Sequence, residues 1–187
     1  MLNGNLFVMD AGGVGGGYTD EALTRLAKLA KRWEVNEAVV ESNFGDGMFT
    51  QLLKPYLTKY HKCTVEERRS SGQKEKRIID TLEPVLMQHR LIVDMRLIEE
   101  DYKTATDPKY SLFFQLTRIT AERGALAHDD RLDALAIAVA YWTEQMDLDQ
   151  QAMSDKHQDE LLEKELRKFM EHAGGFVTSK KGWFERR

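Results

Sequence analysis

The order of apolar and polar residues predicts short strands that alternate with helices over the first half of the chain. Short apolar or alternating runs, bounded by glycine or charged residues, are typical of buried strands. Such runs occur at residues 6–9, 37–41, 63–68 and 91–93. The first run ends at a glycine-rich segment, residues 12–17, which predicts a flexible turn.

Apolar residues spaced three or four apart predict helices between these strands. Thr19, followed by two acids, is a suitable N-cap for a helix that runs to about Trp33. Pro55 and Pro84 lie inside two later helices and are expected to bend or distort them. Further helices are expected from about residue 48, over 73–88, 96–104 and 112–121, and from about 130 to 146.

Strands that alternate with helices up to about residue 93 predict an α/β fold with a partly parallel sheet. From residue 147 the composition changes, because residues 155–172 are highly charged with a heptad-like apolar pattern. The last residues, 174–187, are basic and contain glycine. We therefore expect one domain over residues 1–149, followed by a helical and basic tail over residues 150–187.

The composition is that of a globular protein. The chain has 187 residues, of which 42% are hydrophobic and 31% charged. The net charge of −4 means that any binding to nucleic acid has to come from local basic patches. The single cysteine, Cys63, excludes an internal disulfide. No apolar run is long enough to cross a membrane, and the first ten residues lack the features of a signal peptide.

Three carboxylates, Asp129, Asp130 and Asp133, stand at the start of a helix that is apolar on nearly every face. Such a helix is normally buried, and buried carboxylates are costly without a positive partner. In one interpretation, Asp129 or Asp130 caps the helix and Asp133 pairs with Arg131 or Arg118. In the other, which we favour, a divalent cation lies between carboxylates that share one helix face.

Glu41 is a second candidate ligand, because it ends an apolar strand just before the glycine-bracketed turn at residues 42–47. Ligands of open α/β sheets collect at the carboxyl ends of strands. With Asp130 and Asp133 it forms a set of hard oxygen ligands without a cysteine pair, which predicts Mg²⁺ or Mn²⁺. Two such ions are typical of phosphodiester hydrolysis by nucleases. Asp10, at the end of the first strand, is either a further acid of this site or a residue that opens a turn.

The basic residues Arg68, Lys74 and Arg77 are candidates for binding the DNA backbone beside an acidic metal site. The alternative is that they form an ordinary solvated face. The glycine-rich segment is not followed by Gly-Lys-Ser/Thr, and no Walker motif occurs elsewhere, so the sequence does not predict ATP hydrolysis.

Four segments together resemble the C-terminal nuclease half of the large terminase subunits of short-tailed bacteriophages. The similarity spans about residues 4–148. It is carried by residues 4–13 (GNLFVMDAGG), 40–49 (VESNFGDGMF), 74–85 (KEKRIIDTLEPV) and 124–135 (GALAHDDRLDAL). The resemblance implies an RNase H-like fold, with a mixed sheet flanked by helices. It also implies an endonuclease that depends on two Mg²⁺ or Mn²⁺ ions and cuts concatemeric double-stranded DNA during genome packaging.

By this resemblance, Glu41 matches the middle acid of the family, and the last acid is Asp130 or Asp133, with Asp129 as an outer or alternate ligand. Residues 4–13 resemble the family's second strand, so the first strand and its catalytic aspartate are expected to be missing, as is the ATPase half. Either the chain is a fragment, or another chain supplies the strand, or Asp10 has taken over the role.

The resemblance further implies double-stranded DNA, a terminase small subunit and a portal protein as partners, no membrane, and a location in the cytoplasm of the bacterial host. Two alternatives to the packaging nuclease remain at this point. One is a Holliday-junction resolvase of the same fold. The other is a truncated, inactive domain that only binds DNA or a portal partner.

Overall fold

The computed structural model describes residues 4–42 and 47–179, and the surroundings of side chains up to residue 171. Most of the predicted turn at residues 42–47 and the end of the basic tail, residues 180–187, lie outside the described residues. The chain divides into two compact units, Met1–Trp142 and Thr143–Arg187. The predicted domain boundary near residue 149 stays a prediction.

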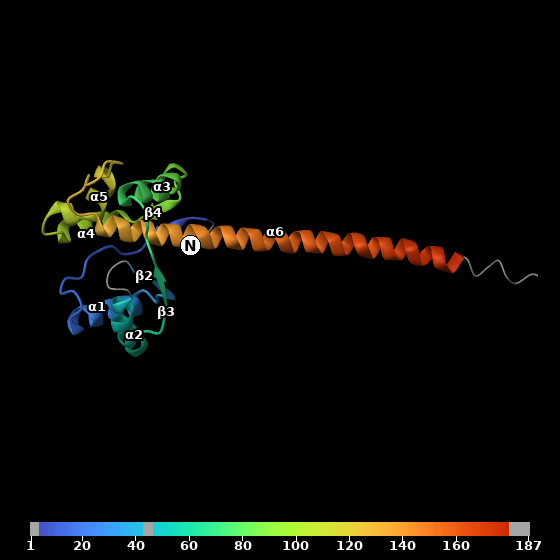
Figure 1. Ribbon diagram of the computed structural model, residues 1–187, viewed down its shortest axis with the longest axis horizontal. Helices are drawn as coiled ribbons and strands as arrows, with labels where there is room; N and C mark the ends of the chain where they lie inside the picture. Colours follow the sequence, from blue (N-terminus) through green and yellow to red (C-terminus); the bar gives the residue numbers. More distant parts are fainter. Residues whose placement is uncertain (1–3, 43–46, 180–187) are drawn as a thin grey trace, which may run out of the picture. The chain divides into compact units, whose positions relative to one another are not determined.

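The four predicted strands are present and pair in parallel. Strand β1 (Leu6–Val8) pairs with β4 (Leu91–Val93). Strand β2 (Glu37–Glu41) pairs with β3 (Thr64–Arg68), and these two strands are labelled in Figure 1. The α/β class is therefore confirmed, but these strands form two separate two-stranded sheets in place of the single mixed sheet expected. With only three residues each, β1 and β4 offer few backbone groups for further pairing, and no described strand joins the two sheets.

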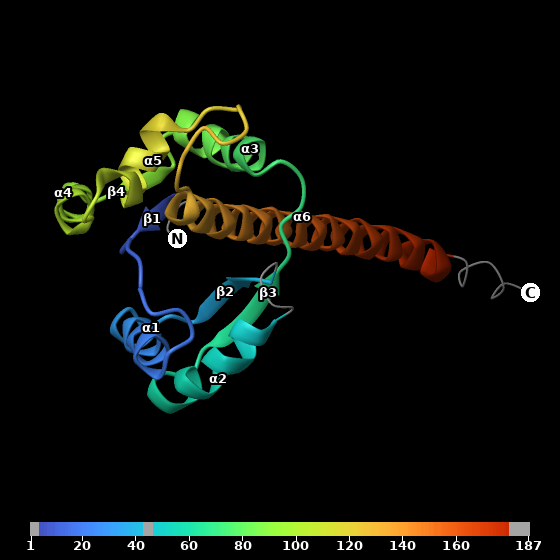
Figure 2. The same ribbon diagram turned by 60° about the vertical axis from the view of Figure 1, so that its left-hand side comes forward.

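The β2–β3 pair packs with two helices into one small core. Helix α1 (Asp20–Arg32) begins after Thr19, whose hydroxyl accepts a hydrogen bond from the Ala22 amide as expected for an N-cap. Helix α2 (Met48–Tyr60) contains Pro55 and lies against α1 (Figure 2). The predicted apolar stripe of α1 is buried in this core, which contains Leu23, Ala27, Ala30, Leu53 and Leu57.

Three further helices precede the acid cluster. Helix α3 (Lys74–Met87) buries Ile78, Leu82 and Val85 on one face and continues past Pro84. Helix α4 (Met95–Thr104), the 3₁₀ turn η1 (Pro108–Tyr110) and helix α5 (Leu112–Arg118) follow in order. Helix α5 is shorter than expected, because the backbone of Ile119 is already extended.

The last helix, α6, runs without a break over Asp130–Ser179. Its first turns bury Leu132, Ala136 and Val139, which recur at helical spacing. The expected end near Met146 is wrong, since the charged segment that follows continues the same helix. In the second unit the apolar residues of this segment are exposed, among them Leu148, Leu161, Leu162, Leu166 and Phe169. None of the helices in the described part of the chain has the length and apolar character that a membrane span requires.

Candidate metal and nuclease site

One face of β2 and one face of α6 line a pocket of about 350 Å³. Alternate residues of a strand point to the same side, so β2 contributes Glu37, Val39 and Glu41. Residues three or four apart share a helix face, and α6 contributes Asp130, Asp133, Ala134, Ile137, Ala138, Tyr141 and Trp142. Lys74 completes the lining. The pocket thus brings together the three predicted acids, Glu41, Asp130 and Asp133.

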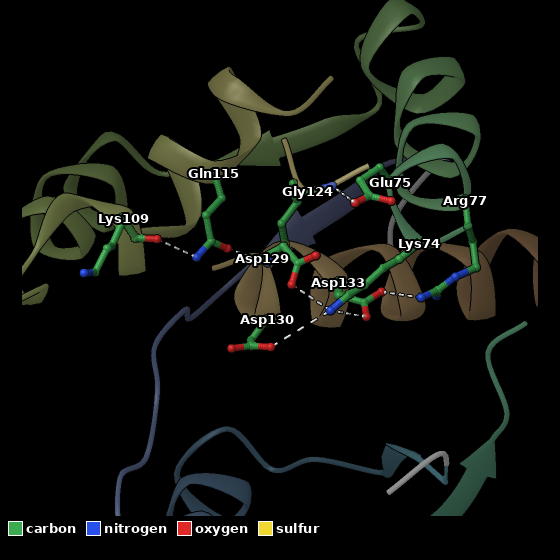
Figure 3. Close-up of polar contacts among 10 residues, drawn as sticks. Lys74, Glu75, Arg77, Lys109, Gln115, Gly124, Asp129, Asp130 and Asp133 are labelled. Carbon is green, nitrogen blue, oxygen red and sulfur yellow. Dashed lines mark hydrogen bonds and ion pairs between the residues drawn. The ribbon is translucent and has the colours of Figure 1, made fainter. Parts of the chain in front are cut away.

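The ammonium group of Lys74 lies among all three aspartates at the start of α6 (Figure 3). Its Nζ is 2.7 Å from Oδ1 of Asp129, 3.2 Å from Oδ2 of Asp133 and 4.0 Å from Oδ1 of Asp130. Partial burial acts to lower the pKa of Lys74. The hydrogen bond to Asp129 and the charges of Asp133 and Asp129 outweigh it, so this pKa is raised above its ordinary value.

Asp133 and Asp130 occupy different environments, although both line the pocket. The side chain of Asp133 is only 5% exposed, and its Oδ1 accepts a hydrogen bond of 2.8 Å from Nη2 of Arg77. The side chain of Asp130 is 86% exposed. The α6 N-terminus also favours negative charge at these positions. The alternative interpretation, in which Asp133 pairs with Arg131 or Arg118, is wrong in its partners: Asp133 pairs with Lys74 and Arg77 of α3.

Two contacts hold the first turn of α3 against the loop that leads into α6. The backbone amide of Gly124 donates a 2.6 Å hydrogen bond to Oε1 of Glu75, and Nε2 of Gln73 donates one of 2.9 Å to the Ala121 carbonyl. The bond from Gly124 lowers the pKa of Glu75. These contacts fix the position from which Lys74 and Arg77 reach the aspartates.

A buried polar network that the sequence patterns did not predict supports the start of α6. Asp101 of α4 is 1% exposed and accepts hydrogen bonds from Nη1 of Arg131 (2.7 Å), from the Ser111 hydroxyl (2.5 Å) and from the Phe113 amide (3.1 Å). Gln115, also 1% exposed, accepts a 3.0 Å hydrogen bond from the Leu132 amide in the first turn of α6. The available signal was a polar residue at a position where the helical spacing of α4 and α5 calls for an apolar one.

Farther along α6 the aromatic residue Tyr141 lines the pocket, and it has one acidic and one basic neighbour. The Tyr141 hydroxyl donates a hydrogen bond to Glu37, and this bond, together with burial, raises the pKa of Tyr141 to about 12. The guanidinium of Arg68 lies over the Tyr141 ring at 4.9 Å and pairs with Glu66 at 2.9 Å. Arg68, a predicted DNA-binding residue, is therefore near the pocket without lining it.

Asp10, the candidate additional acid, is held elsewhere. Its Oδ2 accepts a 2.7 Å hydrogen bond from the Trp33 indole and its Oδ1 one of 2.9 Å from the Ala11 amide. It does not belong to the pocket lining. Asp10 therefore lies outside the pocket that Glu41, Asp130 and Asp133 line, and its role as a further acid of the site stays a prediction.

Comparison with known proteins identifies the family to which this chain is similar. Residues 1–91 match the family described as the Ribonuclease H-like domain of the bacteriophage T7 terminase. The chain is also 48% identical to the large terminase subunit of Enterobacteria phage T3 over 188 aligned residues, which cover 95% of this chain. The predicted terminase family is confirmed. The chain spans about a third (31%) of the length of the phage T3 terminase subunit.

RNase H-like nuclease domains generally use divalent metal ions, and the donor chemistry of this pocket suits them. The lining contains four carboxylates, those of Glu37, Glu41, Asp130 and Asp133, against the single ammonium of Lys74. Within residues 4–42 and 47–179, no three His, Cys, Asp or Glu side chains are grouped closely enough to form a ready metal site. The residues thus fit a hard cation in type and charge, and Lys74 lies between the acids that would bind it.

Proposed function

We propose that this chain is the endonuclease part of a phage DNA-packaging terminase, which cuts concatemeric double-stranded DNA by metal-dependent hydrolysis. The observation that carries the proposal is the shared pocket: Glu41 reaches it from β2, and Asp130 and Asp133 reach it from α6. These residues come from distant parts of the chain, and the terminase relatives supply the biological setting.

In this proposal Glu41, Asp130 and Asp133 hold two Mg²⁺ or Mn²⁺ ions, and Asp129 is an outer or alternate ligand. Bound there, the ions would activate the attacking water and stabilise the leaving 3′ oxygen. The protein contributes the position of each carboxylate. Asp133 is fixed by Arg77, whereas the exposed carboxylate of Asp130 can adjust to an incoming cation.

Arg68, Lys74 and Arg77 are proposed to position phosphates without reading sequence. Arg68 lies on the ring of Tyr141, a residue of the pocket wall, and Lys74 lines the pocket itself. Binding through such contacts weakens steeply as salt rises. We further propose a terminase small subunit and a portal protein as partners, and the cytoplasm of the bacterial host as the location. Both follow from the phage T3 relative, which is a large terminase subunit.

Nicking of supercoiled plasmid DNA in the presence of Mn²⁺ tests this function. We expect the unsubstituted chain to nick the plasmid, and Glu41→Gln to lower the rate by about tenfold or more. Glutamine keeps one oxygen that can coordinate but loses the charge. Glu83→Gln, which removes an exposed carboxylate of α3 outside the pocket, is the matched control and is expected to leave the rate unchanged.

Equal nicking by Glu41→Gln and the unsubstituted chain would remove Glu41 from the site. A chain that shows no Mn²⁺-dependent nicking, yet binds DNA in a salt-sensitive way, would contradict the nuclease assignment for this chain.

A further inference from the structure

Both carboxylate oxygens of Asp133 already carry a positive group. Arg77 donates to Oδ1 at 2.8 Å, and Lys74 lies 3.2 Å from Oδ2. The Asp133 side chain is 5% exposed, so little of its carboxylate is accessible to a third partner. A cation that enters the pocket can therefore bind Asp133 closely only if one of these two groups moves away.

Lys74 is the group on the pocket side. It belongs to the pocket lining, whereas Arg77 does not. Its ammonium is a compact point charge on a flexible four-carbon chain, which can swing away at low cost. The same ammonium is shared with Asp129 at 2.7 Å and with Asp130 at 4.0 Å (Figure 3). Moving this one side chain would therefore remove the positive charge that three carboxylates share.

The electrostatics of the cluster show what Lys74 does while no metal is bound. Three aspartates within one helical turn repel one another, and the repulsion is strongest where the side chains are buried. A single positive charge between them removes most of this repulsion. A divalent ion in the same position interacts twice as strongly with each carboxylate at equal distance.

We propose that Lys74 is an internal counter-ion of the metal site: it holds Asp129, Asp130 and Asp133 together, and the divalent cation displaces it from Asp133 on binding. The inference rests on the proposed function, because it concerns the same acids. Lys74 is thus a positioning residue that sets the affinity of the site, and metal binding exchanges one cation for another.

Mn²⁺ binding, followed by the electron paramagnetic resonance signal of free Mn²⁺, tests the exchange directly. Lys74→Met removes the charge and keeps the length of the side chain. We expect it to lower the Kd for Mn²⁺ by about tenfold. Lys74→Arg keeps the charge and is expected to bind no more tightly than the unsubstituted chain.

Lys76→Met is the matched control, because it removes the same charge from an exposed position two residues away. It is expected to change the Kd by less than about threefold. A Kd for Lys74→Met that equals or exceeds that of the unsubstituted chain would overturn the inference. So would equal tightening by Lys74→Met and Lys76→Met.

A second measurement uses the unsubstituted chain and does not depend on how a variant folds. The rate of acetylation of each lysine is measured by mass spectrometry with and without saturating Mg²⁺. We expect Mg²⁺ to raise the rate at Lys74 at least threefold and to leave Lys76 unchanged, because displacement exposes the Lys74 amine. A rate at Lys74 that stays constant or falls would contradict displacement.

Glu41→Gln separates the inference from the function on which it rests. If Mn²⁺ binding is lost in Glu41→Gln and unchanged in Lys74→Met, the counter-ion role is wrong and the proposed site stands. If Lys74→Met tightens binding and Glu41→Gln has no effect, the counter-ion role stands and the assignment of Glu41 is wrong. Absence of Mn²⁺ binding in the unsubstituted chain and in Lys74→Met would overturn both.

Discussion

Replacing Asp101 by alanine is expected to lower the free energy of unfolding by about 3–5 kcal/mol. The side chain of Asp101 is fully buried and accepts three hydrogen bonds, from Arg131, Ser111 and Phe113. Alanine would leave the guanidinium of Arg131, whose side chain is only 19% exposed, without its carboxylate. The loss of an opposite charge in a buried pair costs much more than the pair itself contributes. Urea denaturation followed by circular dichroism measures the change.

Glu100→Ala is the control for this prediction, since Glu100 is the exposed neighbour of Asp101 on α4. It is expected to change the free energy of unfolding by no more than about 0.5 kcal/mol. If Asp101→Ala and Glu100→Ala have equal free energies of unfolding, the hydrogen-bond network of Asp101 does not stabilise the start of α6.

Asp133→Asn is expected to lower the free energy of unfolding by about 3 kcal/mol and the nicking rate by at least about a hundredfold. The side chain is buried and pairs with both Lys74 and Arg77, so the loss of its charge removes the carboxylate that these two cations share. The same substitution removes the least exposed of the proposed metal ligands. Urea denaturation and the Mn²⁺ plasmid assay measure the two effects separately.

Asp130→Asn provides the comparison within the same helical turn. Its carboxylate is 86% exposed and lies 4.0 Å from Lys74, so its charge contributes little to stability. We expect stability within about 0.5 kcal/mol of the unsubstituted chain, together with a clear loss of nicking. Suppose that Asp130→Asn and Asp133→Asn lower the free energy of unfolding equally. Then the assignment of Asp133 to a buried, paired environment and of Asp130 to an exposed one is wrong.

The sequence predicts most of the elements that build the site, because local patterns determine them. The β2 strand and the start of α6 were placed correctly, and the two periodicities explain how Glu41 and the aspartates reach one pocket. Alternation along β2 places Glu41 on the same side as Glu37, and helical spacing places Asp130 and Asp133 on the same face of α6. The family resemblance pointed to the same acids.

The partners of the acids could not be predicted, because they depend on long-range packing. The sequence offered Arg131 and Arg118 as alternative partners of Asp133, yet Arg131 binds Asp101, 30 residues away along the chain. Lys74 and Arg77 reach the aspartates from 55 and 56 residues away. No local sequence pattern indicates which helix packs beside the start of α6.

Two other differences have separate physical causes. The strands form two separate parallel pairs. Alternation along the sequence identifies a strand, but which strands pair depends on long-range packing. The change in composition after residue 146 suggests an end of the helix there, yet α6 continues to Ser179. Residues 143–172 contain neither glycine nor proline, so nothing in the sequence ends the helix there.

The central claim is that acids from β2 and α6 bind the same metal ions. Anomalous diffraction from crystals soaked in Mn²⁺ tests it most directly. The claim predicts a Mn²⁺ peak in the pocket, with an oxygen of Glu41 and an oxygen of Asp130 or Asp133 each about 2.0–2.6 Å away. A fully soaked crystal whose Mn²⁺ peaks all lie away from these carboxylates would contradict it.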